Sequence, residues 1–189
     1  MSKTILRKAI LARRQALSAQ ELSVCGKAIQ EAFIALPEYQ AAVSIALYVA
    51  VNNEVSTEAV IDHALFSGKL VYLPSVVGSD LEFRRFTSRD DLVRGSFGIM
   101  EPVEGFELAD VAALTMIVVP GVGFDLSGQR IGYGKGYYDK ALHSLEGSGR
   151  LTAFCYDFQI VESLAGEKHD VVMDRIITER RIITPALLK

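Results

Sequence analysis

The chain has 189 residues, of which 50% are hydrophobic and 23% are charged, so it can bury a sizeable core and is not expected to be intrinsically disordered. This length favours a single domain over residues 1–189. The formal net charge of −3 argues against a general nucleic-acid binder, so an anionic ligand has to be met by local positive charge.

The cysteines and the N-terminus indicate a cytoplasmic protein. Cys25 and Cys155 are far apart and form no C-x-x-C pair, which argues against a structural metal site or a disulfide framework. No apolar segment typical of a signal peptide follows the N-terminus, and the apolar run at 41–51 is too short to span a bilayer. We therefore expect two reduced thiols and no membrane partner, and the acidic surface favours a soluble monomer.

The chain is predicted to begin with two helices. Ser2 can cap a first helix that runs to about Leu17. Ser18 and Glu21 form a capping box at the start of a second helix, which has to stop before Pro37.

Strands and helices are then expected to alternate. Residues 43–49 predict a buried strand followed by a polar turn at 52–54, and residues 57–66 predict a helix that Gly68 closes. The regions 87–114 and 120–136 are rich in turns, and a further helix is expected at 137–145. The other strands are expected at 69–73, where Pro74 ends the strand, and at 81–86, 116–119, 151–155, 175–178 and 182–184.

This order of elements predicts an α/β layer fold with a largely parallel central sheet and a mixed edge. In such sheets ligands bind at the carboxyl ends of the strands. Two candidate loops follow buried strands in this way, one after 43–49 and one after 116–119.

The second of these loops is the strongest single signal. It reads P-G-V-G-F-D-L-S-G-Q-R-I-G-Y-G-K-G-Y-Y-D over 120–139. Its alternating glycines let backbone amides approach a phosphate without an intervening Cβ, and the helix that follows offers unpaired N–H groups. Arg130 and Lys135 add positive charge, and Asp139 is a candidate ligand for a divalent cation. The alternative is a flexible surface loop whose glycines only make turns.

Two familiar phosphate motifs do not match this loop. The P-loop of NTPases needs a glycine five residues before its Gly-Lys pair and a Ser or Thr after the lysine, whereas Gln129 and Gly136 stand at these places. The dinucleotide fingerprint G-x-G-x-x-G fails because the third glycine comes one residue early.

The loop instead resembles the signature of the 5-formyltetrahydrofolate cyclo-ligase (methenyltetrahydrofolate synthetase) family, and further motifs agree in order over nearly the whole chain. Only at Lys140, where arginine is commoner, does the loop depart mildly. The other matching segments are Lys3-Thr4-Ile5-Leu6-Arg7 with K-x-x-L-R, 48–57 with Y-x-x-x-x-x-E-x-x-T, 97–102 with F-G-I-x-E-P, and His169-Asp170 followed by Asp174 with H-D-x-x-x-D.

The resemblance implies the three-layer NagB/RpiA/CoA-transferase-like fold and the conversion of 5-formyltetrahydrofolate to 5,10-methenyltetrahydrofolate with ATP and Mg²⁺. It also implies roles for matching residues, with Lys135 and Arg130 as the catalytic cations and Asp139 and Asp170 as the magnesium ligands. The implied folate contacts are Val49, Glu54, Tyr133, Gly134, Lys135, Gly136 and Tyr137. The implied ATP contacts are Lys3, Thr4, Ile5, Leu6, Arg7, Arg130, Ile131, Gly132, Tyr133, Gly134, Lys135, Gly136, Tyr137 and Tyr138.

Residue chemistry alone leaves structural alternatives open. Lys3 and Arg7 can form a solvated helix face, and Glu54 can be an exposed carboxylate in a turn. Asp170 can be a helix cap or a surface charge. Phe124 is as compatible with the core as with stacking on a pterin. Other weak candidates are Tyr137 for stacking, Arg150 for a phosphate contact, His169 for a structural role, and Asp174 for support of Arg175 or of a turn.

Two other functions compete with the cyclo-ligase interpretation. One is a non-catalytic protein that binds nucleotide or folate on the same scaffold. The other is an isomerase or CoA-transferase-like enzyme, which rests on analogy at the level of the fold alone.

Overall fold

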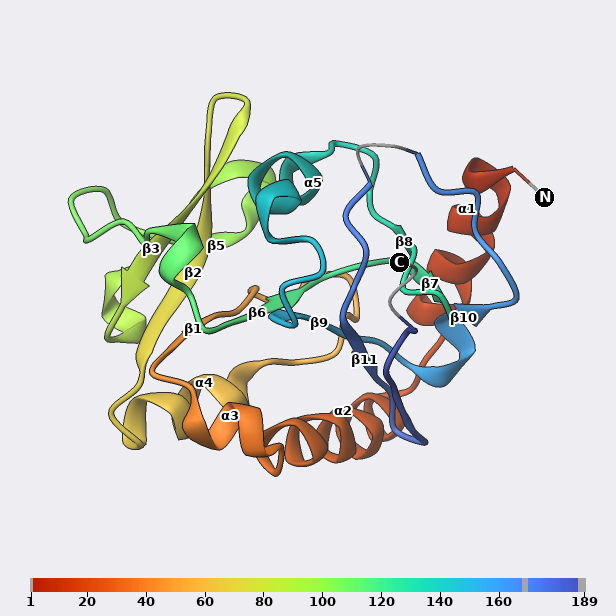
Figure 1. Cartoon of the computed structure of the whole chain (residues 1–189), viewed down its shortest axis with the longest axis horizontal. Helices are drawn as coiled ribbons and strands as arrows, with labels where there is room; N and C mark the ends of the chain where they lie inside the picture. Colours follow the sequence, from red (N-terminus) through yellow and green to blue (C-terminus); the bar gives the residue numbers. More distant parts are fainter. Residues whose placement is uncertain (1, 168–169, 187–189) are drawn as a thin grey trace.

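The centre of the molecule is a seven-stranded sheet in the order β12-β11-β9-β6-β1-β2-β3 (Figure 1). The computed structural model describes residues 2–167 and 170–186, so His169 lies outside the described residues. Neighbouring strands from β11 to β2 are parallel, whereas β12 and β3 pair antiparallel at the two edges. This confirms the largely parallel sheet with mixed edges. The strand bounds are β1 Ser44–Ala46, β2 Leu70–Val77, β3 Asp80–Phe86, β6 Met116–Val119, β9 Leu151–Phe154, β11 Arg175–Ile177 and β12 Ile182–Ile183.

Helices cover both faces of this sheet, which gives three layers. Helices α2 (Ala19–Ile34), α3 (Pro37–Ala41) and α4 (Glu58–Phe66) lie below the sheet in Figure 1, and α5 (Tyr137–Leu142) lies above it. In strand β6, Met116 and Val118 point into the core between the sheet and helices α2 and α4. Ile117 and Val119 point into the core between the sheet and α5. The strand is apolar at every position because both of its faces are buried.

Helix α1 (Lys3–Gln15) lies away from these layers, beside a three-stranded sheet of β10 (Ile160–Val161), β7 (Gly123–Asp125) and β8 (Arg130–Ile131). Ile10 of α1 is buried against Val122 and Ile131. The cap signals read from the sequence are confirmed. The Ser2 hydroxyl accepts a hydrogen bond from the N–H of Ile5, and Ser18 and Glu21 form the capping box of α2.

Several predicted elements differ from the structure. The strand expected at 43–49 spans only Ser44–Ala46. The loop expected at 120–136 contains the β7–β8 hairpin. The expected helix at 137–145 ends as an α-helix at Leu142 and continues as a 3-10 turn, His143–Leu145. The strand that Pro74 was expected to end runs on to Val77.

The geometry of β2 explains why Pro74 does not end it. The Tyr72 carbonyl accepts from the Leu47 N–H beside β1, and the Val76 N–H donates to Glu101. The backbone hydrogen-bonding groups of these alternate residues therefore point away from β3. Pro74 lies between them, past Tyr72, the last residue of β2 that pairs with β1. Its missing N–H therefore removes no hydrogen bond from the sheet.

The turn-rich region 87–114 folds around a two-stranded sheet of β4 (Leu92–Arg94) and β5 (Met100–Pro102). The Glu101 carboxylate is buried and accepts from the Ser75 hydroxyl at 2.8 Å, the Val76 N–H at 3.1 Å and the Ser96 N–H at 2.9 Å. These bonds attach the turn before β5 to the edge of β2. Short 3-10 turns at Arg89–Asp91, Ser96–Gly98 and Val111–Ala113 complete the region, and another at Asp157–Gln159 follows β9.

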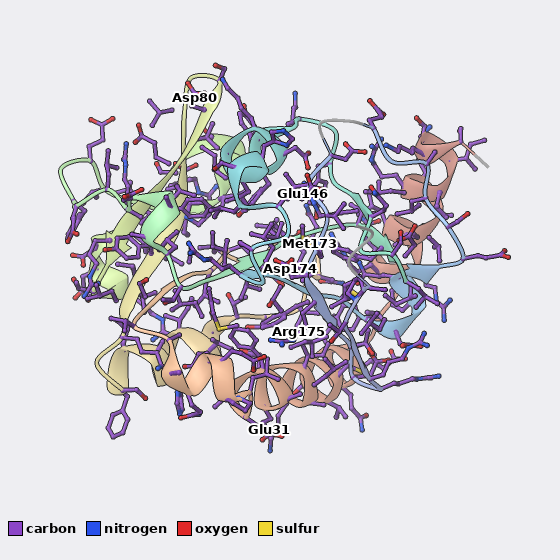
Figure 2. The ribbon with its side chains drawn as sticks, viewed as in Figure 1. Glu31, Asp80, Glu146, Met173, Asp174 and Arg175 are labelled. Carbon is purple, nitrogen blue, oxygen red and sulfur yellow. The ribbon has the colours of Figure 1, made fainter. Side chains whose placement is uncertain are left out.

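Side chains at the surface and in the interior separate clearly. Glu31 on α2 and Asp80 at the tip of the β2–β3 hairpin point outward (Figure 2), whereas Met173 is buried and Asp174 is half-buried. Both cysteines are free thiols. Within the described residues, none of the helices combines the length and apolar character needed to cross a bilayer.

Candidate functional site

A cavity of about 810 Å³ opens where the chain leaves β1 and β6, at the carboxyl ends of these parallel strands. Both loops that the sequence singled out contribute to its walls, as expected for this type of sheet. The lining residues are Lys3 and Arg7 of α1; Tyr48, Val49, Val51, Asn52 and Glu54 after β1; Pro74, Val76 and Leu81 of the β2–β3 hairpin; Gly98, Ile99 and Glu101; Pro120 and all residues of 130–139; and Glu167 and Asp170.

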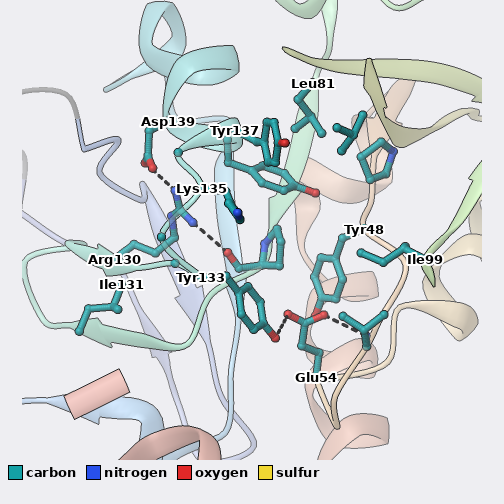
Figure 3. A pocket seen from close by; sticks show the side chains of 18 of the residues that line it. Tyr48, Glu54, Leu81, Ile99, Arg130, Ile131, Tyr133, Lys135, Tyr137 and Asp139 are labelled. Carbon is teal, nitrogen blue, oxygen red and sulfur yellow. Dashed lines mark hydrogen bonds and ion pairs between the residues drawn. The ribbon is translucent and has the colours of Figure 1, made fainter. Parts of the chain in front are cut away.

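The cavity has a cationic end and an end with a buried carboxylate. Figure 3 shows Arg130, Lys135 and Asp139 on one side and Tyr48, Glu54 and Ile99 on the other. Tyr133 reaches from the glycine-rich loop towards Glu54.

Arg130 organises the cationic end. Its guanidinium donates to the Pro120 carbonyl at 3.2 Å and to the Asp139 carboxylate at 2.5 Å, and the side chain is buried. A Cβ on Gly132 would lie 2.9 Å from Arg130 Nη1, so a side chain here would displace the guanidinium from its close approach to the loop. Gly134 and Gly136 have backbone φ values of 91° and 72°, which residues with a side chain rarely adopt.

Lys3 and Arg7 reach the same end from α1. Lys3 Nζ lies 2.8 Å from Asp170 and 3.1 Å from Glu167, and the hydrogen bond to Asp170 is the main cause of its raised pKa. Arg7 Nε donates to the Gly132 carbonyl at 2.8 Å. The solvated-face alternative is therefore wrong for this pair, because both side chains contact segments that are more than a hundred residues away in sequence.

The residues between them behave differently. Thr4, Ile5 and Leu6 are absent from the cavity lining among the described residues. Leu6 packs against the cluster of Ile10, Val122 and Ile131, and Ile5 is 57% exposed. A helix presents positions i and i+4 on one face, so only the first and last residues of this five-residue motif point into the cavity.

Glu54 lies at the other end, on a turn made by two asparagines in the left-handed region, Asn52 at φ 50° and Asn53 at φ 58°. Its side chain is buried, so the exposed-turn alternative is wrong. One carboxylate oxygen accepts from the Val51 N–H at 3.0 Å and the other accepts from the Tyr133 hydroxyl at 2.9 Å.

Burial raises the pKa of the Glu54 carboxyl, and the Val51 N–H, the charge of Arg14 and the Tyr133 hydrogen bond oppose that rise. Burial also raises the pKa of Tyr133 to about 12, so its phenol stays protonated and donates. The pair thus presents a hydrogen-bond acceptor that is fixed in place before any ligand arrives.

Asp139 and Asp170 meet at the cationic end. The same Asp139 oxygen that faces Arg130 accepts from the Val171 N–H at 3.2 Å, which brings Asp139 next to the segment that carries Asp170. In the described part of the chain there is no group of three or more His, Cys, Asp or Glu side chains that could hold a metal. Two carboxylates fit a cation such as Mg²⁺, which takes one or two protein carboxylates and completes its shell with phosphates and water.

The apolar wall was largely missed by the sequence analysis. Pro74, Val76, Leu81 and Ile99 line the cavity. Ile99 lies in the matched motif at 97–102, to which no role was assigned, and Pro74 was expected only to end a strand. Because these residues come from a hairpin and a separate turn, only the pairing of β2 with β3 and the Glu101 bonds bring them together.

Three other candidates have structural roles. Phe124 is fully buried in the core. Arg150 donates to the carbonyls of Ala112 at 2.6 Å and Leu114 at 3.2 Å and does not line the cavity. Asp174 accepts from the Leu151 N–H at 2.9 Å, so it supports the start of β9, while Arg175 pairs with Glu38.

Arg14 was missed altogether. The sequence analysis placed no function on it, yet it is buried and donates to the Asn52 carbonyl, the Gly121 carbonyl and the Tyr133 hydroxyl. A signal existed in the spacing. Lys3, Arg7 and Arg14 are four and seven residues apart, which puts them on one side of a helix with 3.6 residues per turn.

Known proteins resemble this chain over most of its length. A family model described as the 5-formyltetrahydrofolate cyclo-ligase family matches residues 1–179. The mouse 5-formyltetrahydrofolate cyclo-ligase is 29% identical over 186 residues, which cover 92% of this chain and 92% of the mouse protein. The 5-formyltetrahydrofolate cyclo-ligase of Escherichia coli strain K12 is 26% identical over 175 residues, covering 90% and 96%.

Solved structures show the same likeness. The 5,10-methenyltetrahydrofolate synthetase of Aquifex aeolicus superimposes with a TM-score of 0.86 at 36% identity, covering 97% of this chain and 93% of that chain. A 5,10-methenyltetrahydrofolate synthetase of Mycoplasma pneumoniae superimposes with a TM-score of 0.78 at 27% identity, covering 95% and 99%.

Proposed function

Because this chain belongs to the 5-formyltetrahydrofolate cyclo-ligase family and is thus an enzyme of the ligase class, we propose that it converts 5-formyltetrahydrofolate to 5,10-methenyltetrahydrofolate, using ATP and Mg²⁺ and releasing ADP and phosphate. One observation carries this proposal. A single cavity has a cationic, glycine-rich end suited to phosphates and an apolar end with a fixed carboxylate suited to a pterin, and the two ends meet at Tyr133.

The reaction needs an activated formyl group, because a formamide is a poor electrophile. In the proposed sequence the formyl oxygen attacks the γ-phosphorus of ATP, an O–P bond forms, and ADP leaves. The neighbouring folate nitrogen then attacks the formyl carbon and gives up its proton to solvent, a C–N bond closes the ring, and phosphate leaves with the former formyl oxygen. Phosphoryl transfer of this kind depends on positioning and on charge stabilisation more than on covalent chemistry by the protein.

The cationic end supplies that charge stabilisation. Arg130 is held between Pro120 and Asp139, and Lys135 projects from the adjacent loop into the cavity (Figure 3). We assign both to the transferring γ-phosphoryl group, and Lys3 and Arg7 to the other phosphates of ATP. Asp139 and Asp170 would hold Mg²⁺, which neutralises phosphate charge when it is bound.

The other end orients the folate. The Glu54 carboxylate is a suitable acceptor for the amino and ring N–H groups of a pterin, and its bonds to Val51 and Tyr133 fix its plane. Val49 and the apolar wall of Pro74, Val76 and Ile99 enclose the flat ring. Tyr133 to Tyr137 then lie along both substrates, where the formyl group has to meet the γ-phosphate.

The test is the absorbance of the methenyl product when pure protein is mixed with 5-formyltetrahydrofolate, ATP and Mg²⁺. Turnover that stops when ATP is left out supports the proposal, and no product at high enzyme concentration contradicts it. If calorimetry then detects binding of an ATP analogue and the folate without turnover, the protein is a non-catalytic binder. A sugar-phosphate or CoA-ester ligand without ATP hydrolysis would instead favour the isomerase or transferase alternative.

Lys135→Ala tests the assigned catalytic cation. We expect kcat to fall about 10²–10³-fold, because one group that stabilises the transition state is removed. Lys140→Ala is the matched control, since Lys140 pairs on the surface with Asp80 and does not line the cavity. An exposed ion pair of this kind contributes little, so turnover of the control should be unchanged. Equal activity in the two variants would refute the role of Lys135.

A further inference from the structure

Arg14 is a buried cation that belongs to neither end of the cavity. Its residue is 1% exposed, it lies in the last turn of α1, and it is absent from the cavity lining among the described residues. A buried charge is unfavourable unless hydrogen bonds and an opposite charge compensate it. The groups that bind the Arg14 guanidinium therefore determine whether its burial is tolerated.

Its three hydrogen bonds go to three separate segments. Nε donates to the Asn52 carbonyl at 2.9 Å, Nη1 donates to the Gly121 carbonyl at 3.3 Å, and Nη2 donates to the Tyr133 hydroxyl. Asn52 belongs to the turn that carries Glu54, Gly121 to the loop after β6, and Tyr133 to the glycine-rich loop. The planar guanidinium fork is what allows one side chain to reach all three.

The bond to Tyr133 continues into the site. The Tyr133 hydroxyl accepts from Arg14 and donates to Glu54 at 2.9 Å, so the three side chains form a continuous chain of hydrogen bonds. The guanidinium also lies 5.8 Å from the centre of the Tyr133 ring. Arg14 thus fixes both the position of the Tyr133 ring and the direction in which its proton points.

The same contacts also fix the two ends relative to each other. Helix α1 carries Lys3 and Arg7 at the cationic end, and Arg14 attaches this helix to the turn of Glu54 and to the glycine-rich loop. The Asn53 amide adds a return bond to the Arg14 carbonyl at 3.2 Å. A shift of either end has to break one of these bonds.

From this arrangement we propose that Arg14 is a positioning residue, which aligns the folate end with the nucleotide end by holding Tyr133 on Glu54. The inference rests on the proposed function for the identity of the two substrates. It assigns Arg14 no contact with either of them. A side chain that only fills the core would stabilise the fold without acting through Tyr133, and this difference can be measured.

The experiment is a double-mutant cycle of Arg14→Lys and Tyr133→Phe, measured by kcat/KM for 5-formyltetrahydrofolate and by its Kd from calorimetry. Arg14→Lys keeps the charge but loses the fork, and Tyr133→Phe keeps the ring but loses the hydroxyl. Each single variant is expected to lose about tenfold or more in kcat/KM, because each breaks a hydrogen bond to a charged group. The double variant should be within about twofold of the weaker single variant, because groups that act as one unit are not additive.

Arg13→Lys is the matched control. Arg13 is exposed on the same turn, and its guanidinium lies 4.4 Å from the centre of the Phe158 ring, outside the cavity. Its substitution should leave kcat/KM unchanged. The melting temperature of every variant is recorded, so that a loss of folded protein is not taken for a loss of alignment.

The outcomes separate this inference from the proposed function. Additive losses in the cycle, or a wild-type rate in folded Arg14→Lys, overturn the role of Arg14 while the cyclo-ligase activity stands. If the wild type binds the folate but shows no turnover, the proposed function fails and the cycle in Kd alone decides the role of Arg14. If the wild type does not bind 5-formyltetrahydrofolate, both fail together.

Discussion

The two ends of the cavity are held in opposite ways. At the cationic end, Arg130 pairs with Asp139 and Lys3 pairs with Asp170, so charges of both signs already face each other. At the end that we assign to folate, the carboxylate of Glu54 is held by two uncharged donors, the Val51 N–H and the Tyr133 hydroxyl. A ligand at the first end has to exchange ion pairs, whereas the acceptor at the second end is already in place. Substitutions should therefore act at the first end by breaking ion pairs, and at the second end by weakening a single acceptor that is already in place.

The largest loss is expected when the charge pattern of the cationic end is broken. Arg130→Met keeps most of the volume but removes the cation beside Asp139. We expect kcat/KM for ATP to fall about 10²–10³-fold, since a group that stabilises developing charge in a buried site is lost. The measurement is initial rate against ATP concentration, with the melting temperature recorded beside it.

The Arg89–Asp62 pair provides a matched control for that variant. It joins the same residue types at 3.0 Å, but both side chains are exposed. Because exposed ion pairs contribute about 0–1 kcal/mol, Arg89→Met should change neither rate nor melting temperature much. If both arginine variants lost activity equally, the buried pair would have no special role at the cationic end.

A smaller loss is expected at the folate end. Glu54→Gln keeps the shape of the side chain and, through its one oxygen, the bond from Tyr133, but it removes the negative charge and the acceptor of the Val51 N–H. We expect kcat/KM for 5-formyltetrahydrofolate to fall about 10–100-fold, because a hydrogen bond to a charged group is stronger than one between neutral groups. The KM for ATP should change little. A rise in the ATP KM as large as the folate effect would show that the two ends are not separable in this way.

The pH dependence should differ between the ends in the same sense. Burial raises the pKa of Glu54 above its ordinary value, so the charged form, which we propose as the acceptor for the pterin, appears only at higher pH. The acid limb of kcat/KM for the folate is therefore expected above the ordinary pKa of a glutamate, and Glu54→Gln should remove that limb. A limb at the ordinary pKa or below would contradict the assignment.

As the pH rises, the contribution of Glu54 to stability should fall while activity rises. A carboxyl whose pKa is raised in the folded state binds its proton more tightly there than in the unfolded chain. The folded state therefore loses stability as the pH rises from the ordinary pKa through the raised one. Other carboxyl groups, such as Glu38 with its lowered pKa, change the stability of both proteins alike. The difference in unfolding free energy between wild type and Glu54→Gln, measured in urea, should therefore shift against the wild type across this window.

The smallest effect is expected from Gly132→Ala. The added Cβ would lie 2.9 Å from Arg130 Nη1, and the guanidinium can yield only by stretching its bonds to Pro120 and Asp139. We expect a loss of about two- to fivefold in kcat/KM for ATP, within the cost of a weakened hydrogen bond. Gly26→Ala is the control, because nothing lies within 4 Å of its Cβ. It should leave activity unchanged and raise stability by about 0.5–1 kcal/mol, since alanine favours a helix interior.

The sequence was most informative where chemistry is local. Cap residues Ser2 and Ser18 and the buried strand at 116–119 are recognised from neighbouring residues, and the structure confirms them. The glycine-rich loop is recognised in the same way and lines the cavity. Lys135 and Asp139 could be identified from the sequence because they belong to one short segment, and both line the cavity. Their assigned contacts with ATP and Mg²⁺ stay predictions.

It was least informative where a role depends on distant contacts. Pro74 was expected to end a strand because proline has no backbone N–H. It does not, because the neighbouring strand β1 stops before Pro74, and the sequence does not reveal that length. Thr4, Ile5 and Leu6 were grouped with Lys3 and Arg7 because they belong to one motif, yet the helix turns them away from the cavity.

By itself, the sequence determined the layer architecture, because periodicity and caps act over a few residues. The ordered motifs pointed to the family, and glycine spacing singled out the loop that we assign to phosphate binding. Only the tertiary structure decided that Glu54 is buried and bonded to Tyr133, and that Arg14 joins both to α1. These contacts link residues 38 to 119 positions apart. Packing of the whole chain, and not local preference, sets which distant groups lose their water and meet each other.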